Sequence, residues 1–165
     1  MGEVRHAYSP VMGVMRTVAR ILLGLFLLFA GSAHLTFGRE EFQAQVPTWL
    51  PIDADLVVLV SGVIEIALGL ALLVARRHRA TVGWVTAAFF VAIFPGNVAQ
   101  WWEGRDAFGL DTDRGRFIRL FFQPVLIAWA LWSTGAWRAW RERRDQREQM
   151  RGEQRTDSSG GAATP

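Results

Sequence analysis

Four apolar stretches, each nearly free of charged residues, constrain this chain more than any other feature. They cover about residues 18–37, 56–75, 80–100 and 117–137. Each is about 20 residues long, which lets a helix cross a hydrocarbon core of about 30 Å. Inside lipid, a single segment satisfies its own backbone hydrogen bonds only as a helix. We therefore predict an all-α fold, a bundle of four transmembrane helices over residues 18–137.

The distribution of arginine predicts the orientation of this bundle. Arginines are concentrated before residue 21, in the loop at 76–79 and in the tail from residue 138. The opposite side carries fewer, namely Arg39, Arg105, Arg114, Arg116 and Arg119. Arginine-rich segments remain in the cytoplasm, and an even number of spans places both termini on one side. We predict a multi-pass protein of the bacterial inner membrane with both termini in the cytoplasm.

The segments outside the spans differ in character. Residues 1–17 form a short cytoplasmic N-terminus, and residues 138–165 form a charged cytoplasmic tail. The tail should start as a helix and become disordered from Thr156, where Ser and Gly prevent a packed core. The connection between the first two spans contains Phe42, Val46, Trp49 and Leu50. It is too apolar for a free linker, so we expect it to lie on the outer membrane surface or over the mouth of the bundle.

The first span has an alternative interpretation as a cleavable signal peptide. Arg16 and Arg20 are followed by an apolar run and then by the small residues at 31–33, an order typical of secretory leaders. We favour a retained helix, because the bundle would lose a packing partner on cleavage.

Composition excludes several kinds of chemistry. The chain has no cysteine, which rules out disulfides, thiolate zinc sites and dithiol redox reactions. The formal charge is only +3, and the basic residues lie at membrane borders, so the bilayer is a better partner than nucleic acid. The sequence contains no phosphate loop, catalytic triad motif or metal motif, and we expect no stand-alone catalytic activity.

Each predicted span carries at least one polar side chain in the half remote from the termini. We call these residues the polar cluster: His34, Glu65, Asn97, Arg119 and Gln123. Intramembrane polar groups are costly and usually face the bundle interior. A carboxyl, an imidazole, a guanidinium and two amides in one region favour a ligand site. The alternative, which the sequence leaves open, is that they hold the helices together and bind nothing, with Glu65 protonated or paired with Arg119.

Glycines lie on the same helical faces as two of these residues. Gly24 and Gly31 precede His34, and Gly62 and Gly69 flank Glu65 at helical spacing. Small residues let neighbouring helices approach closely, so we assign these glycines to packing. Two prolines, Pro95 and Pro124, should each free a backbone carbonyl beside the polar cluster.

The order of several short motifs resembles the DoxX family of small bacterial membrane proteins over about residues 15–140. These motifs are Gly31-x-x-His34, Val46-Pro47-x-Trp49-Leu50-Pro51, Gly62-x-x-Glu65-x-x-x-Gly69, Phe94-Pro95-x-Asn97 and Arg119-x-x-x-Gln123. The resemblance implies a four-helix membrane fold and a link to redox or oxidative-stress complexes, with a quinone as the cofactor class. It carries over no catalytic residue. The lack of cysteine argues against a thiol relay.

Three functional hypotheses follow. In the first, the chain is a membrane subunit whose polar cluster binds a small lipid-soluble molecule such as a quinone, and Glu65 handles a proton. In the second, it is a non-enzymatic scaffold that docks a soluble or membrane redox partner through its tail or outer loop. A small transporter ranks lowest, because four helices without an inverted repeat would need to form a homo-oligomer for alternating access.

Overall fold

A computed structural model describes the backbone of residues 10–160. The side chains of residues 10, 153 and 155–160, and all of residues 1–9 and 161–165, lie outside the description. The described residues form helices and no β-strand, which confirms the all-α class. The helices are α1 (Pro10–Leu35), α2 (Arg39–Gln43), α3 (Ala54–Val74), α4 (Arg79–Trp102), α5 (Asp113–Leu120), α6 (Phe122–Ser133) and α7 (Ala136–Gly160). Part of the predicted N-terminal segment 1–17 therefore belongs to α1.

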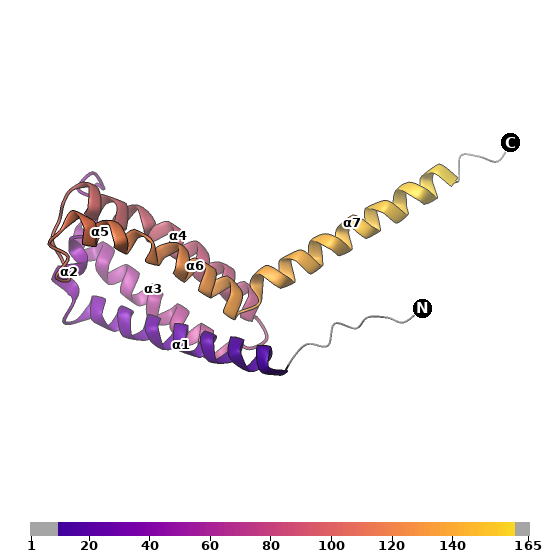
Figure 1. Ribbon diagram of the computed structural model, residues 1–165, viewed down its shortest axis with the longest axis horizontal. Helices are drawn as coiled ribbons and strands as arrows, with labels where there is room; N and C mark the ends of the chain where they lie inside the picture. The colour runs from indigo at the N-terminus through magenta and orange to yellow at the C-terminus, as the bar shows by residue number, and fades with distance from the viewer. Residues whose placement is uncertain (1–9, 161–165) are drawn as a thin grey trace.

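Four long rods lie side by side in the bundle: α1, α3, α4, and α5 together with α6 (Figure 1). The main contacts pair α1 with α3 and α4 with α6, and α6 also packs on α1. One end carries α2 and the loops at 36–53 and 103–112; we call it the α2 end. The other end, from which α7 leaves, we call the α7 end. Both the start of α1 and the end of α6 lie at the α7 end (Figure 1).

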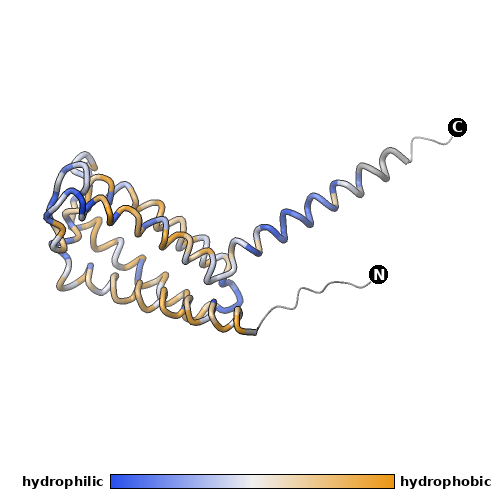
Figure 2. Tube along the Cα trace, in the orientation of Figure 1, coloured by the Kyte–Doolittle hydropathy of each residue, from blue (hydrophilic) through white to orange (hydrophobic). Residues whose placement is uncertain are grey.

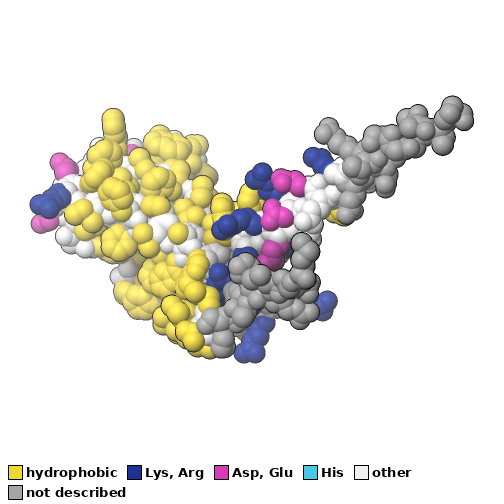
Figure 3. Space-filling view, turned by 45° about the vertical axis from the view of Figure 1, so that its right-hand side comes forward, with side chains coloured by type: hydrophobic (Ala, Val, Ile, Leu, Met, Phe, Trp, Pro, Cys, Tyr) yellow, Lys and Arg dark blue, Asp and Glu magenta, His cyan; other side chains and the backbone are white. Residues whose placement is uncertain are grey.

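Three of these helices are long and apolar enough to cross a membrane by length and composition, namely Val11–Leu35, Ala54–Val74 and Arg79–Trp102. A fourth span is present if the bent pair Asp113–Ser133 and Ala136–Gly152 counts as one. The apolar colouring extends along the bundle and changes to polar along α7 (Figure 2). Apolar side chains cover much of the bundle face drawn in Figure 3. Phe29 and Val125, for example, are 65% and 60% exposed. Such an apolar surface fits helices that cross a membrane.

The fourth span is not the single helix predicted over 117–137. It begins at Asp113, is interrupted at Phe121, and ends at Ser133. Pro124 has no N–H for the carbonyl of Leu120, which explains the break just before it. Gly135 has φ +71°, a left-handed conformation that glycine adopts without strain and that terminates helices. Pro95, by contrast, is accommodated inside an unbroken α4.

The tail also differs from its prediction. α7 leaves the bundle at 62° to the preceding segment and remains helical to Gly160, which includes residues 156–160 of the part expected to be disordered. Residues 161–165 of that part lie outside the described residues. Ion pairs at helical spacing support its exposed first part, with Arg138 Nε 3.4 Å from Glu142 and Arg144 Nε 2.8 Å from Glu148.

Glycines hold α1 and α3 in direct backbone contact. A Cβ added at Gly31 would lie 2.6 Å from the carbonyl oxygen of Gly62, and one at Gly69 would lie 2.8 Å from that of Gly24. No real side chain fits at such distances. Between the two helix pairs, the core contains Leu23, Leu27 and Phe90, all at most 2% exposed. The tight α1–α3 contact determines how the polar side chains of these two helices meet.

Candidate functional site

His34 and Glu65 form a buried pair across the α1–α3 contact. His34 Nδ1 lies 3.1 Å from Glu65 Oε2 and 2.8 Å from the carbonyl oxygen of Ala30. A carbonyl only accepts, so Nδ1 carries a hydrogen, and it is directed at Ala30. Glu65 is 5% exposed, and its Oε2 has no hydrogen-bond partner among the described residues. The short distance between His34 Nδ1 and Glu65 Oε2 is compatible with the lack of a hydrogen bond between them, because the Nδ1 hydrogen is directed at the Ala30 carbonyl.

Both residues line a cavity of about 260 Å³ at the α2 end. Its walls come from α3, through Val57, Val58 and Ser61, and from α4, through Ala92, Ile93, Pro95 and Gly96. The lining is mainly apolar, and Glu65 and His34 are its ionisable groups. A pocket of this kind, largely apolar with a few convergent polar groups, is the usual form of a small-molecule site.

The loop between α1 and α3 covers this cavity. Val46, Pro47, Trp49 and Leu50 all line it, so the apolar residues of the loop face the bundle. Gly96 makes the contact possible, because a Cβ there would lie 2.5 Å from the carbonyl oxygen of Gln45. Without a side chain at position 96, the loop backbone rests directly on α4.

Charged side chains fasten this loop to its surroundings. Arg105 donates to the carbonyl oxygens of Val46, at 2.6 Å, and Gln43, at 3.2 Å. Arg39 pairs with Asp55 at the start of α3, and this hydrogen bond raises the pKa of Arg39 above its ordinary value. The cover is therefore held from both sides, by the α4–α5 loop and by α3.

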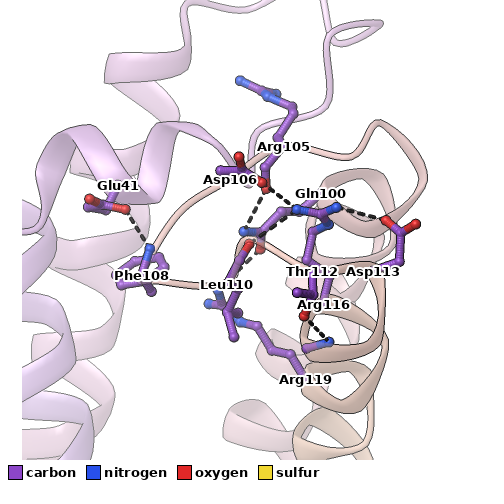
Figure 4. A network of polar contacts seen from close by, with 11 residues as sticks. Glu41, Gln100, Arg105, Asp106, Phe108, Leu110, Thr112, Asp113, Arg116 and Arg119 are labelled. Carbon is purple, nitrogen blue, oxygen red and sulfur yellow. Dashed lines mark hydrogen bonds and ion pairs between the residues drawn. The ribbon is translucent and has the colours of Figure 1, made fainter.

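The α4–α5 loop has a polar network of its own (Figure 4). The Phe108 N–H donates to Glu41 at 2.6 Å, and Arg116 pairs with Asp106 and, at 2.7 Å, with Asp113. Arg119 donates to Gln100 at 3.1 Å in the same network. These contacts join both loops of the α2 end into one cap.

Aromatic rings connect this cap to the buried pair. The imidazole of His34 stacks on Phe42 with centroids 3.5 Å apart, and Phe42 meets the Phe108 ring edge-on at 4.7 Å. The Arg119 guanidinium lies over the Phe108 ring, 4.8 Å from its centroid. Phe108 has φ +56°, which costs a bulky residue of order 1–3 kcal/mol. The cap holds this strained residue where its ring bridges Phe42 and Arg119.

Asn97 and Gln123 form a separate interior pair. Asn97 donates to Gln123 at 3.0 Å, and Gln123 donates to the backbone oxygen of Phe90 at 2.5 Å. Both are at most 8% exposed. Pro95 has no N–H for the carbonyl of Val91, but Gln123 binds the carbonyl of Phe90, one residue earlier. Neither side chain lines the cavity, so this pair joins α4 to α6.

The predicted polar cluster is therefore divided. Glu65 and His34 face the cavity, Asn97 and Gln123 bind each other, and Arg119 binds Gln100 and not Glu65. The structure adds Phe42, Ser61 and Gln100 to the site or its cap. Residue 100 is only the last residue of the third predicted span, and Phe42 is predicted only as an apolar loop residue. Ser61 precedes Glu65 by four residues, about one helical turn, and this spacing could have indicated it.

No group of three or more His, Asp or Glu side chains that could hold a metal ion occurs among the described residues. The groups facing the cavity can exchange hydrogen bonds or a proton with a small molecule.

Comparison with known families identifies one match. A family model described as a domain of unknown function (DUF8561) matches residues 23–134. No curated protein and no solved structure matches the chain. The resemblance to the DoxX family was therefore wrong. Short motifs of Gly, Pro and one polar residue are what close helix packing in lipid demands, and their order alone does not distinguish one four-helix family from another.

Proposed function

Since the chain belongs to the family of domains of unknown function DUF8561, whose description names no activity, we propose a function from the site alone. The protein is an integral membrane protein whose α2-end cavity binds a small lipid-soluble molecule with a hydroxyl or carbonyl group. It acts as a binding subunit and has no catalytic activity of its own. Glu65 and His34 contact the polar group of the ligand.

The observation that carries this proposal is Glu65 Oε2, which lies 3.1 Å from His34 Nδ1 but has no hydrogen-bond partner among the described residues. This oxygen belongs to a side chain that is 5% exposed and borders the cavity. Leaving a buried polar atom unsatisfied costs about 1–3 kcal/mol. A ligand hydroxyl donating to this oxygen would remove that cost. If the carboxyl is protonated, it can instead donate to a ligand carbonyl, so the site suits either group.

The size of the cavity limits the ligand. A cavity of roughly 150 Å³ holds benzene, and drug-sized ligands occupy roughly 300–1,000 Å³. The observed volume of about 260 Å³ lies between these values. It suits one substituted ring, such as the head group of a quinone or a phenol, with any long chain remaining outside.

The position of the cavity supports entry from the bilayer. Its walls belong to α3 and α4, which pack mainly on other helices and less on each other. Apolar side chains on these helices, such as Val60 and Val91, are 50% and 56% exposed. A ligand dissolved in lipid can pass between such helices without crossing water. The arginine distribution would place this cavity in the outer half of the membrane.

A scaffold function is the second candidate, and α7 is the observation that favours it. This helix projects from the bundle at 62° and carries exposed charged side chains with Trp137 and Trp140 at its base. Such a helix could dock a soluble redox partner, and the polar cluster would then serve packing alone.

Mass spectrometry of small molecules that copurify with the full chain tests the proposal. The key variant is Ser61→Phe, which fills the cavity from α3. Its control is Ser32→Phe on α1, an exposed serine that also bonds its own helix backbone. We expect one small molecule bound to wild type and to Ser32→Phe, and its loss from Ser61→Phe. Equal retention by both variants, or none in wild type, would refute the site.

A further inference from the structure

A second cavity, of about 270 Å³, lies at the α7 end of the bundle, opposite the site described above. Arginines from four parts of the chain line it: Arg16 and Arg20 of α1, Arg76 of the α3–α4 loop, Arg79 of α4 and Arg138 of α7. No aspartate or glutamate is among the described residues that line it. Arg138 is also paired with Glu142, which does not line the cavity. The like charges of Arg20, Arg76 and Arg79 repel each other across this space, and an anion there would neutralise them.

Arg20 shows that this is more than a row of surface arginines. Its side chain is only 6% exposed, and it donates to the carbonyl oxygen of Leu72 on α3. A guanidinium has five donors, so one such bond leaves others for a ligand. Arginines at a membrane border are common, but dispersed ones remain in water. Here a buried guanidinium and the exposed Arg76 and Arg79 face the same hollow.

We propose that this cavity binds a phosphate group. Guanidinium forks match the spacing of phosphate oxygens and bind them in pairs. The cavity lies where the helices end, and α1 exposes Val14 and Val18 beside it, at 63% and 49%. A phosphate carried by an anionic lipid could therefore enter the arginine cavity while its acyl chains lie along α1. Free inorganic phosphate offers the same chemistry without the chains.

The test is the melting temperature of the full chain in micelles of a neutral maltoside detergent, which has no phosphate, alone or with added phosphatidylglycerol. Inorganic phosphate at constant ionic strength forms a third arm. The double variant Arg76→Gln/Arg79→Gln removes two cavity arginines that are exposed, so folding should not depend on them. The control Arg77→Gln/Arg143→Gln removes two exposed arginines that do not line the cavity.

We expect phosphatidylglycerol to raise the melting temperature of wild type and of the control by about 5 °C or more, the effect of a ligand at roughly 100 times its dissociation constant. The cavity variant should show no such rise. Stabilisation by inorganic phosphate as strong as by the lipid would identify free phosphate as the ligand. The proposal is overturned if neither ligand stabilises wild type, or if the control loses the effect as the cavity variant does.

Discussion

The imidazole of His34 and the ring of Phe42 lie face to face, with centroids 3.5 Å apart and planes 16° from parallel. His34 belongs to a long membrane helix and Phe42 to the short helix α2 at its end. The stack fixes the plane of the imidazole, and the Nδ1–H bond to Ala30 fixes its rotation. As a result, the Nδ1 hydrogen of His34 does not bond to Glu65 Oε2, which has no hydrogen-bond partner among the described residues.

The first prediction is that Phe42→Leu destabilises the protein. Leucine keeps an apolar side chain but loses the ring face, a change of about 0.5–1.5 kcal/mol for an aromatic pair. The melting temperature in detergent should fall by about 2–4 °C for each kcal/mol in a chain of this length. Phe26→Leu is the control, since Phe26 is 44% exposed on α1. An equal decrease in both variants would mean that the stack contributes nothing specific.

The second prediction separates a ligand site from structural packing at Glu65. In protein freed of small molecules, Glu65→Leu should keep or raise the melting temperature, because it removes a buried oxygen that has no hydrogen bond. Glu65→Gln should fold as well. Glu65→Leu should lose the copurifying molecule, whereas Glu65→Gln, which keeps an oxygen acceptor and an N–H donor, should retain part of it. A clear fall in the melting temperature of Glu65→Leu would instead show that the carboxyl holds α1 to α3.

This expectation differs from the one that the sequence supported. Pairing of Glu65 with Arg119 was then an open alternative, and leucine at 65 would have left a guanidinium unpaired. In the structure, Arg119 donates a hydrogen bond to Gln100 and not to Glu65. Glu65→Leu therefore removes no partner of Arg119.

The third prediction concerns the glycine contact. Gly31→Ala places a Cβ 2.6 Å from the backbone oxygen of Gly62, so α1 and α3 must separate. We expect a loss of about 1–3 kcal/mol, typical of overpacking. Gly13→Ala on the same helix meets nothing within 4 Å and should be neutral or slightly stabilising, since alanine favours helix. Thermal unfolding of the two variants checks this, and similar values would contradict a tight α1–α3 contact.

Helical periodicity explains how much of the site was visible in the sequence. Gly31 and His34 share one face of the first span, as Gly62 and Glu65 do in the second. The structure brings these two faces together. Three of the spans could also be predicted from the sequence, because the thickness of the lipid core sets a minimum length for a run of apolar residues.

The cap could not be predicted, because loops have no periodicity. Arg105 reaches Val46 and Phe108 reaches Glu41, contacts between residues far apart in sequence. Nothing local in either loop indicates its partner. The break at Phe121 could not be predicted either. Pro124 follows a helix interruption, but Pro95 lies inside a helix that continues unbroken, so a proline alone does not predict a break.

The fourth prediction concerns topology. The arginine distribution requires both termini to be cytoplasmic. A reporter fused after Pro165 should be active if it works only in the cytoplasm, and inactive if it works only in the periplasm. The reverse result would place the cavity lined by Glu65 in the inner half of the membrane.

The central claim is that Glu65 is the polar end of a cavity reached from lipid, and reaction with a membrane-soluble carbodiimide tests it most directly. This reagent dissolves in the bilayer and adds to protonated carboxyl groups. Peptide mass mapping of the full chain in lipid vesicles would locate the adduct. We predict modification of Glu65 in wild type and in Ser32→Phe, and strongly reduced modification in Ser61→Phe. An unmodified Glu65 in wild type, or equal modification in both serine variants, would contradict the account.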